Sequence, residues 1–372
     1  MAKSENPDSS VSFALRLYQQ LASKLEENLF FSPASVAATL SIALLGARNK
    51  TRQEILEVLG IDDETKVHAK NLDMLKGGGK ETVLRCACQV FPDLQFTLQE
   101  EFQEACRKFY GSRIEALDFK QCSEDSRKFI NDWAQSATEG KIKELLPAGC
   151  LNAQTRLVLA NAIYFKGNWM HKFNEADTRT AKFYVSENKA VDVQMMTQQR
   201  KYNFYHDPAA ELQVVEIPYA GGDVCLTLLV PTKRCGLSEV ETVLTDSYLQ
   251  NIGTKFSEQE VLLSLPKLSI EHSIVDLHNH LRLLGIADLF DNNRADLTGI
   301  SRQAGLHATS LVHKAALEIN EEGTEAAAAT AVTIGFLMLL PPVAVTCDHP
   351  FMVLIKDKSR DLILFVGRFM SP

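Results

Sequence analysis

The first third of the chain carries apolar side chains at the spacing of α-helices. Between residues 12 and 25 an apolar side chain recurs every four positions: Phe13, Leu17, Leu21 and Leu25. Positions four apart share one face of a helix, so this segment predicts a helix with one buried side. The same kind of pattern predicts further amphipathic helices over residues 99–110 and 124–137.

The segment SPASVAATLSIALLGAR, residues 32–48, is apolar on nearly every face. It opens with Ser32 and Pro33, residue types that are favoured at the start of a helix. A helix that is apolar all round has to be surrounded by protein. We therefore expect this helix at the centre of the core.

Most of the remaining chain has β-type patterns. Residues 155–169, TRLVLANAIYFKGNW, are rich in branched and aromatic side chains. Further strands are predicted as a pair over 212–231 joined at Gly221-Gly222, a second pair over 260–274, and a terminal hairpin over 351–369. Helices early and antiparallel strands late indicate a mixed α+β fold, in one continuous domain over residues 1–372.

Composition limits the class of protein. The chain has 372 residues, 45% of them hydrophobic, and a formal net charge of −8 without a basic block. A chain of this kind can bury a large core, which excludes a disordered or collagen-like protein. It lacks the positive surface expected for binding nucleic acid or an anionic membrane, so the expected partners are proteins.

The N-terminal 25 residues lack the apolar run of a secretion signal, and no later stretch has the length and apolarity of a membrane span. The lack of such a signal, together with eight scattered cysteines, predicts reduced thiols and a cytoplasmic location. Release of the protein without a cleaved signal stays open. Cys86 and Cys88 are two positions apart and would point the same way on a strand. A buried pair of small apolar side chains is favoured there over metal or redox use.

Enzyme motifs are missing from the sequence. It contains no GxSxG, HExxH or Walker A motif and no GxGxxG after a predicted strand. His272, His278 and His280 do not form a metal site by pattern, because helix positions two apart do not share a face and no carboxylate or cysteine completes the set. We expect no catalytic residues, no metal and no cofactor.

The segment EEGTEAAAATAVTIGFLMLLPPV, residues 321–343, differs from the rest of the chain. It has one acidic residue after Gly323, no basic residue, and a second half of large apolar side chains. In an extended strand one face would carry only uncharged residues: Thr324, Ala326, Ala328, Thr330, Val332 and Ile334. The segment could therefore enter a protein core as a strand, and its small side chains offer little steric resistance.

Several motifs, in order along the chain, resemble the serpin family in its ovalbumin-type, intracellular branch. They are LFFSPASVAATLSIALLGAR (29–48), INDWAQSATEGKIKELLP (130–147), NAIYFKGNW (161–169), ADLTGIS (295–301), VHKAALEINEEGTEAAAATA (312–331) and DHPFMVLIKDKSRDLILFVGRFMSP (348–372). The resemblance implies about nine helices around three mostly antiparallel sheets, with an exposed reactive-centre loop over about residues 321–342. A protease cuts this loop, and the loop then inserts into the large sheet and traps the acyl-enzyme.

The resemblance also assigns residues to sites. The hinge of the loop would be Glu321, Glu322, Gly323, Thr324, Glu325, Ala326, Ala327, Ala328, Ala329 and Thr330. A polar cluster under the centre of the sheet, the shutter, would be Ser32, Ser35, Asn161 and His313. The breach, where the loop first enters, would be Trp169, Lys267 and Glu321, with an ion pair between Lys267 and Glu321. The stretch 87–91, ACQVF, departs from the family pattern. The resemblance therefore does not predict the packing of this stretch near the first helices, but the implied mechanism is unchanged.

Counting from the hinge as in the family places the scissile bond at Leu337-Met338, flanked by Phe336 and Leu339. No lysine or arginine lies between Ala315 and Ile355, which argues against a trypsin-like target. The expected partner is a serine protease of the chymotrypsin, cathepsin G, chymase or elastase type, inhibited by a monomer that can polymerise. Two alternatives stay open: a non-inhibitory storage or chaperone protein, and an inhibitor of a cysteine cathepsin.

Overall fold

The computed structural model describes residues 9–23, 27–62, 68, 82–111, 114–322 and 341–372. Its helices are α1 (Ser9–Ala22), α2 (Pro33–Gly46), α3 (Asn49–Leu59), α5 (Glu100–Tyr110), α6 (Ser123–Ala137), α7 (Leu237–Val243), α8 (Asp246–Lys255) and α9 (Leu277–Leu284), with short 3-10 helices η1 (Glu175–Asp177) and η2 (Asp288–Phe290). Among the described residues, no helix is long and apolar enough to cross a membrane.

The described residues also form thirteen strands. They are β1 (Leu29–Phe31), β2 (Thr82–Pro92), β3 (Leu157–Gly167), β4 (Arg179–Ser186), β5 (Lys189–Asp207), β6 (Leu212–Pro218), β7 (Val224–Pro231), β8 (Ser257–Pro266), β9 (Leu268–Ile274), β10 (Ser310–Ile319), β11 (Val343–Thr346), β12 (Phe351–Asp357) and β13 (Leu362–Phe369). The mixed α+β class predicted from the sequence is confirmed.

The strands form two hydrogen-bonded networks. One sheet has four strands in the order β2-β3-β10-β9, and the other network runs β1-β13-β12-β7-β6-β5-β8-β11 with β4 attached to β5. The three predicted sheets correspond to these two networks, because β5 is nineteen residues long and pairs with β4 and β8 along one part and with β6 near its end. It thereby joins what would otherwise be two separate sheets.

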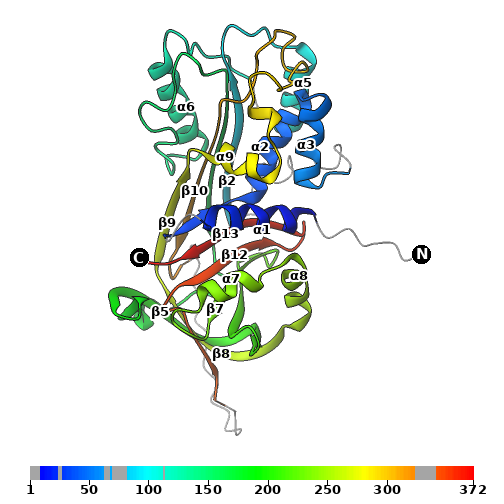
Figure 1. The fold of residues 1–372 in the computed structure, drawn as a ribbon. Helices are drawn as coiled ribbons and strands as arrows, with labels where there is room; N and C mark the ends of the chain where they lie inside the picture. The colour runs from blue at the N-terminus through cyan, green and yellow to red at the C-terminus, as the bar shows by residue number, and fades with distance from the viewer. Residues whose placement is uncertain (1–8, 24–26, 63–67, 69–81, 112–113, 323–340) are drawn as a thin grey trace, which may run out of the picture.

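Helices α2 and α6 cover opposite faces of the four-stranded sheet (Figure 1). Two consecutive residues of β2 show this arrangement, because consecutive side chains of a strand point to opposite faces of the sheet. Ala87 belongs to the apolar cluster that contains Ile130 of α6, whereas Cys88 lies 3.7 Å from the carbonyl oxygen of Ser35 in α2. The sheet is therefore buried on both sides along this part of β2.

The sequence explains why α2 takes the central position. All of its residues except Ala37 and Leu45 are buried, as the all-round apolar pattern predicted. The helix begins where Ser32 accepts a hydrogen bond from the backbone N–H of Ser35, at 3.1 Å, and Pro33 occupies the first helical position.

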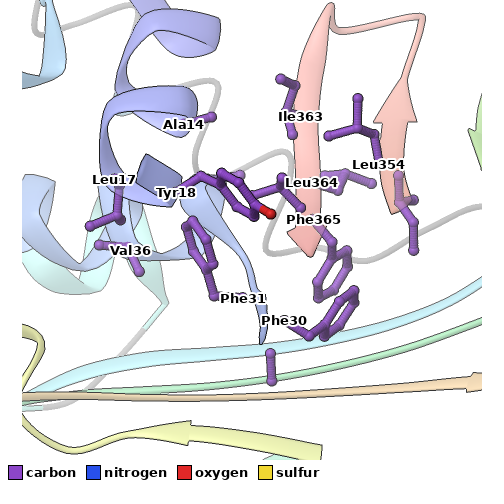
Figure 2. Close-up of a cluster of buried hydrophobic side chains, with 14 of the residues drawn as sticks. Ala14, Leu17, Tyr18, Phe30, Phe31, Val36, Leu354, Ile363, Leu364 and Phe365 are labelled. Atoms are coloured by element: carbon purple, nitrogen blue, oxygen red, sulfur yellow. The ribbon is translucent and has the colours of Figure 1, made fainter. Parts of the chain in front are cut away.

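A single apolar core joins the two ends of the chain (Figure 2). Tyr18 of α1 points toward the hairpin of β12 and β13, Leu17 lies beside Val36 of α2, and β1 pairs antiparallel with β13. Phe30 of β1 stacks on Phe365 of β13 with ring centroids 5.1 Å apart. The terminal hairpin predicted from the sequence is present, as is the predicted β6-β7 pair.

The segment 260–274 folds differently from a simple strand pair. It forms the two predicted strands, β8 and β9, but β8 pairs with β5 and β11 whereas β9 pairs with β10. The chain leaves one network and enters the other at Lys267, whose backbone N–H donates to Gln194 O at 2.8 Å. The first helix also begins earlier than predicted, at Ser9.

Candidate functional site

The predicted reactive-centre loop falls between β10 of the four-stranded sheet and β11 of the other network. It follows β10, and the chain resumes before β11, which pairs in parallel with β8. Of the predicted hinge, Glu321 and Glu322 are described. The other predicted loop residues lie outside the described part of the chain: Gly323, Thr324, Glu325, Ala326, Ala327, Ala328, Ala329, Thr330, Phe336, Leu337, Met338 and Leu339.

The strand that precedes the loop lies directly against β3. β10 runs parallel to β3, in register from Ser310 opposite Val158 to Leu317 opposite Phe165. The outer pairs of the same sheet, β2 with β3 and β10 with β9, are antiparallel. The four-stranded sheet thus has one parallel contact at its centre, and the loop begins at the end of one of the two strands that form it.

Glu321 is fixed by three contacts at the predicted breach. Its Oε2 lies 2.8 Å from Lys267 Nζ, and its Oε1 accepts a hydrogen bond from Thr178 Oγ1 at 2.7 Å. Its carbonyl oxygen accepts a bond from the backbone N–H of Phe173 at 3.1 Å. The structure therefore contains the predicted contact between Lys267 and Glu321 and adds two partners that the sequence did not indicate.

Trp169 holds the residue before Glu321. Its indole Nε1 donates to the carbonyl oxygen of Asn320 at 2.8 Å, and its ring stacks on Tyr219 with centroids 4.5 Å apart. The three predicted breach residues thus meet at Asn320 and Glu321, where the predicted hinge begins. Because the main chain is bound on both sides, the start of the loop has a defined position.

The environment of Glu321 favours its charged form. Burial raises the pKa of this carboxyl group, but hydrogen bonds from Lys267 and Thr178 and the charge of Lys267 outweigh burial and lower the pKa below its ordinary value. Glu321 is therefore an anion at neutral pH, and the side chain of Lys267 is 42% exposed. The pair is half open to water, which limits its strength.

The predicted shutter residues meet under the parallel contact. His313 of β10 and Asn161 of β3 are register partners, and His313 Nδ1 bonds Asn161 Oδ1. Ser35 Oγ of α2 donates to the same Oδ1 at 2.9 Å, and the backbone N–H of Ser32 donates to His313 Nε2 at 3.1 Å. One cluster of hydrogen bonds therefore links β3, β10 and α2.

The amide nitrogen of Asn161 completes the cluster. It donates to Ser35 O and Thr39 Oγ1, both at 3.0 Å, and to Cys88 Sγ at 3.0 Å. Thr39 and Cys88 were not among the predicted site residues. Thr39 could have been found, because it lies one helical turn after Ser35 on α2. Cys88 and the breach residue Thr178 lie far from their partners in the sequence and gave no such signal.

The hydrogen bonds fix the charge and tautomer of His313. Its Nε2 accepts from a backbone N–H, so the ring carries its proton on Nδ1 and is neutral. Burial and, to a lesser extent, the nearby His272 together lower the pKa of His313 to about 3. A proton on Nε2 would place two donors against each other and break the contact with Ser32.

The serpin family, described as serine protease inhibitors, matches residues 8–372. The chain belongs to the serpin family. It is 38% identical to leukocyte elastase inhibitor A of Rattus norvegicus, covering 97% of both chains, and 37% identical to Serpin B3 of Homo sapiens, covering 98% and 99%.

The solved structure of uncleaved ovalbumin matches this serpin with a TM-score of 0.89 at 26% identity, covering 98% of this chain and 99% of the other. The ovalbumin-type family and the serpin fold predicted from the sequence motifs are thus confirmed. This serpin is a protease inhibitor by family and not an enzyme.

The neutral His313 makes stability depend on pH. An unfolded histidine takes up a proton below about pH 6.5, whereas the native ring remains neutral down to about pH 3. The unfolded state therefore binds more protons in this window, and the free energy of unfolding falls as pH decreases, by up to about 1.4 kcal/mol per pH unit from this one group. Denaturant unfolding between pH 4 and 7 should show a shallower pH slope for His313→Asn than for the parent. Equal slopes would contradict the buried neutral ring.

Charge reversal at Glu321 tests the breach. Glu321→Lys places two cations where an ion pair was, which we expect to cost about 1–2 kcal/mol after allowance for solvent. The start of the loop should loosen, and polymers should form faster on mild heating, as measured by size-exclusion chromatography. Glu322→Lys is the matched control, because it makes the same charge change at an exposed side chain. If both variants polymerise at the rate of the parent, Glu321 does not hold the hinge.

Proposed function

We propose that this serpin is a suicide-substrate inhibitor of serine proteases with chymotrypsin-like or elastase-like specificity. In this mechanism the protease cuts the loop at Leu337-Met338, and the part of the loop that follows β10 inserts between β3 and β10. The observation that carries the proposal is the parallel contact between these strands, together with the position of the loop at the end of β10.

Strand direction favours that insertion site. A segment that continues from β10 and turns back runs antiparallel to β10, and it also runs antiparallel to β3, because β3 and β10 are parallel. The sheet would then be β2, β3, the new strand, β10 and β9, with every neighbour antiparallel. Antiparallel pairing is slightly more stable per residue than parallel pairing.

The free energy gained on insertion can be estimated from the hydrogen-bond ladders between neighbouring strands. Insertion breaks the ladder between β3 and β10 and makes two new ones, a net gain of one ladder. At about 1 kcal/mol for each net hydrogen bond, this is on the order of 5–10 kcal/mol. The residues assigned to the inner face support entry, since Thr324, Ala326, Ala328 and Thr330 are small and uncharged.

The shutter and the breach then have defined roles. The bond between His313 and Asn161 spans the two strands that must separate, and the contacts of Glu321 hold the segment that must enter first. Both sets of contacts resist spontaneous insertion in the uncut protein. We propose that they keep the loop outside the sheet until a protease cuts it.

The apolar loop supports the proposed target class. Leu337 at the cleavage position, with Phe336 and Leu339 beside it, suits a protease with a hydrophobic specificity pocket, such as chymotrypsin, cathepsin G, chymase or an elastase. The names of the leukocyte elastase inhibitor relatives agree with this class. Non-inhibitory function and inhibition of a cysteine cathepsin are the outcomes against which the proposal is tested.

A cytoplasmic monomer is the proposed form. All eight cysteines are free thiols in the structure, which fits a reducing compartment. The Asn49-Lys50-Thr51 sequon starts helix α3, with Thr51 fully buried and the amide of Asn49 donating to Asp296 Oδ2 at 2.7 Å. These contacts oppose glycosylation at Asn49.

Two arginine variants test the mechanism. Inhibition requires insertion to outrun hydrolysis, and a hundredfold lead corresponds to only about 2.7 kcal/mol. Thr324→Arg would force an unpaired cation into the sheet core at a cost of several kcal/mol. We expect the variant to be cut at Leu337-Met338 by chymotrypsin with almost no covalent complex on a denaturing gel. Glu325→Arg, predicted to face solvent, should keep most of the complex.

The same reaction separates the alternatives. A new N-terminus at Met338 supports the assigned bond, and a cut elsewhere would move it. A parent protein that chymotrypsin and elastase cleave without a covalent complex is a substrate, which would favour the non-inhibitory alternative. Equal trapping by both arginine variants would refute the assigned inner face or the insertion itself.

A further inference from the structure

A pair of thiols on β2 reaches into the shutter. Cys86 and Cys88 point to the same face of the strand, and their Sγ atoms are 3.7 Å apart. Cys88 Sγ accepts the hydrogen bond from Asn161 Nδ2 and lies 3.7 Å from Ser35 O. A close pair of thiols therefore touches the side chain that joins β3, β10 and α2.

The two sulfur atoms differ in their chemistry. Burial raises the pKa of the Cys88 thiol, but hydrogen bonds from Cys86, Thr39 and Asn161 outweigh burial and lower it below the ordinary value. The hydrogen bond to Cys88 raises the pKa of Cys86 well above the ordinary value, and burial adds to this. Cys88 is thus the sulfur that takes the negative charge, and Cys86 the one that keeps its proton.

A cavity brings small molecules to the edge of β2 beside the pair, where Cys86 is half-buried and Cys88 is 6% exposed. It has a volume of about 660 Å³ and is lined by residues of β2, α5 and α6, among them Cys86, Cys88, Tyr110 and Trp133. A hydrogen peroxide molecule needs little more room than a water molecule, whose share of liquid volume is about 30 Å³.

We propose that Cys86 and Cys88 form a redox modification site, where a hydroperoxide converts the two thiols into a disulfide and thereby loosens the shutter. The Cys88 thiolate attacks one oxygen of the peroxide, the O–O bond breaks, hydroxide leaves and a sulfenic acid forms. The Cys86 thiol then attacks the sulfenic sulfur, and the S–S bond forms as water departs. The hydroxide takes up the proton that Cys88 lost, so two thiols are oxidised and one peroxide becomes two waters.

The disulfide would act directly on Asn161. The two sulfur atoms, now 3.7 Å apart, must come within about 2 Å of each other. This movement would draw Cys88 Sγ away from Asn161 Nδ2, which donates a hydrogen bond to it in the reduced protein. Cys88 is the register partner of Asn161, so a bend in β2 falls opposite the shutter. β2 can bend because, among the described strands, it stands at the end of the sheet order.

A weaker hold on Asn161 should let β3 and β10 separate more readily. This consequence rests on the proposed function, since it assumes that the two strands part during insertion. Formation of the disulfide does not rest on it. The two steps can therefore be tested by different readouts.

The chemical step is tested in the full-length protein with the exposed Cys122, Cys150 and Cys235 replaced by serine. The protein is treated with hydrogen peroxide, alkylated in the denatured state and digested with trypsin, which releases residues 86–107 as one peptide because Arg85 and Arg107 flank it. We expect Cys106 to be the only alkylated cysteine of this peptide. Cys86 and Cys88 together should have lost two hydrogens, about 2 mass units relative to the two free thiols, and dithiothreitol should reverse this loss. Alkylation of both Cys86 and Cys88 after peroxide would overturn the proposal.

The coupling to the sheet is tested by heating. Peroxide should lower the thermal midpoint of the protein and raise its rate of polymerisation severalfold, whereas Cys86→Ser, which cannot form the disulfide, should not show the reversible change. A disulfide that leaves both quantities unchanged would overturn the link to the shutter. Trapping of chymotrypsin by the reduced protein is measured in a separate experiment. If no covalent complex forms, the proposed function is rejected, but the mass-spectrometric result on the disulfide still holds.

Discussion

The parallel contact between β3 and β10 is the constraint on which the rest of the structure depends. Parallel neighbours cannot be joined by a short turn, so the chain between them must leave the sheet and return. Residues 168–309 make that crossing and build β4 to β9, three α-helices and two short 3-10 helices on the way. Five strands of the larger network, β4 to β8, thus belong to the segment that connects β3 to β10. The predicted loop follows β10 in the chain, so it starts from the end of one of the two strands that form this contact.

Two polar clusters hold this contact closed. The shutter ties β3 to β10 and to α2 through fully buried side chains, and a buried network is strong while every member has a partner. The breach is more open to water, and its ion pair is correspondingly weaker. In the proposed mechanism the contacts at the breach give way first, and the buried shutter sets the resistance at the centre of the sheet. Cys88 belongs to the buried shutter cluster, so the proposed disulfide would act there.

The sequence predicted the features that depend on neighbouring residues. The all-round apolar pattern with Ser32 and Pro33 located α2, and Gly221-Gly222 located the turn between β6 and β7. It did not predict that β8 and β9 belong to different networks, because the break at Lys267 resembles a turn and the partners are distant. For the same reason the contact of Thr178 with Glu321, 143 positions away, had no local signal. The shutter and breach were found through the family motifs and not through spacing.

The most direct test of insertion is the thermal stability of the cut protein. The chain is cleaved once between residues 323 and 340 by limited proteolysis, and its unfolding is compared with that of the uncut protein by circular dichroism. A net gain of one strand ladder, on the order of 5–10 kcal/mol, predicts that the midpoint of this 372-residue chain rises by about 6–13 °C. A cleaved protein that unfolds at the temperature of the uncut protein would show that the loop stays outside the sheet, and it would contradict the account.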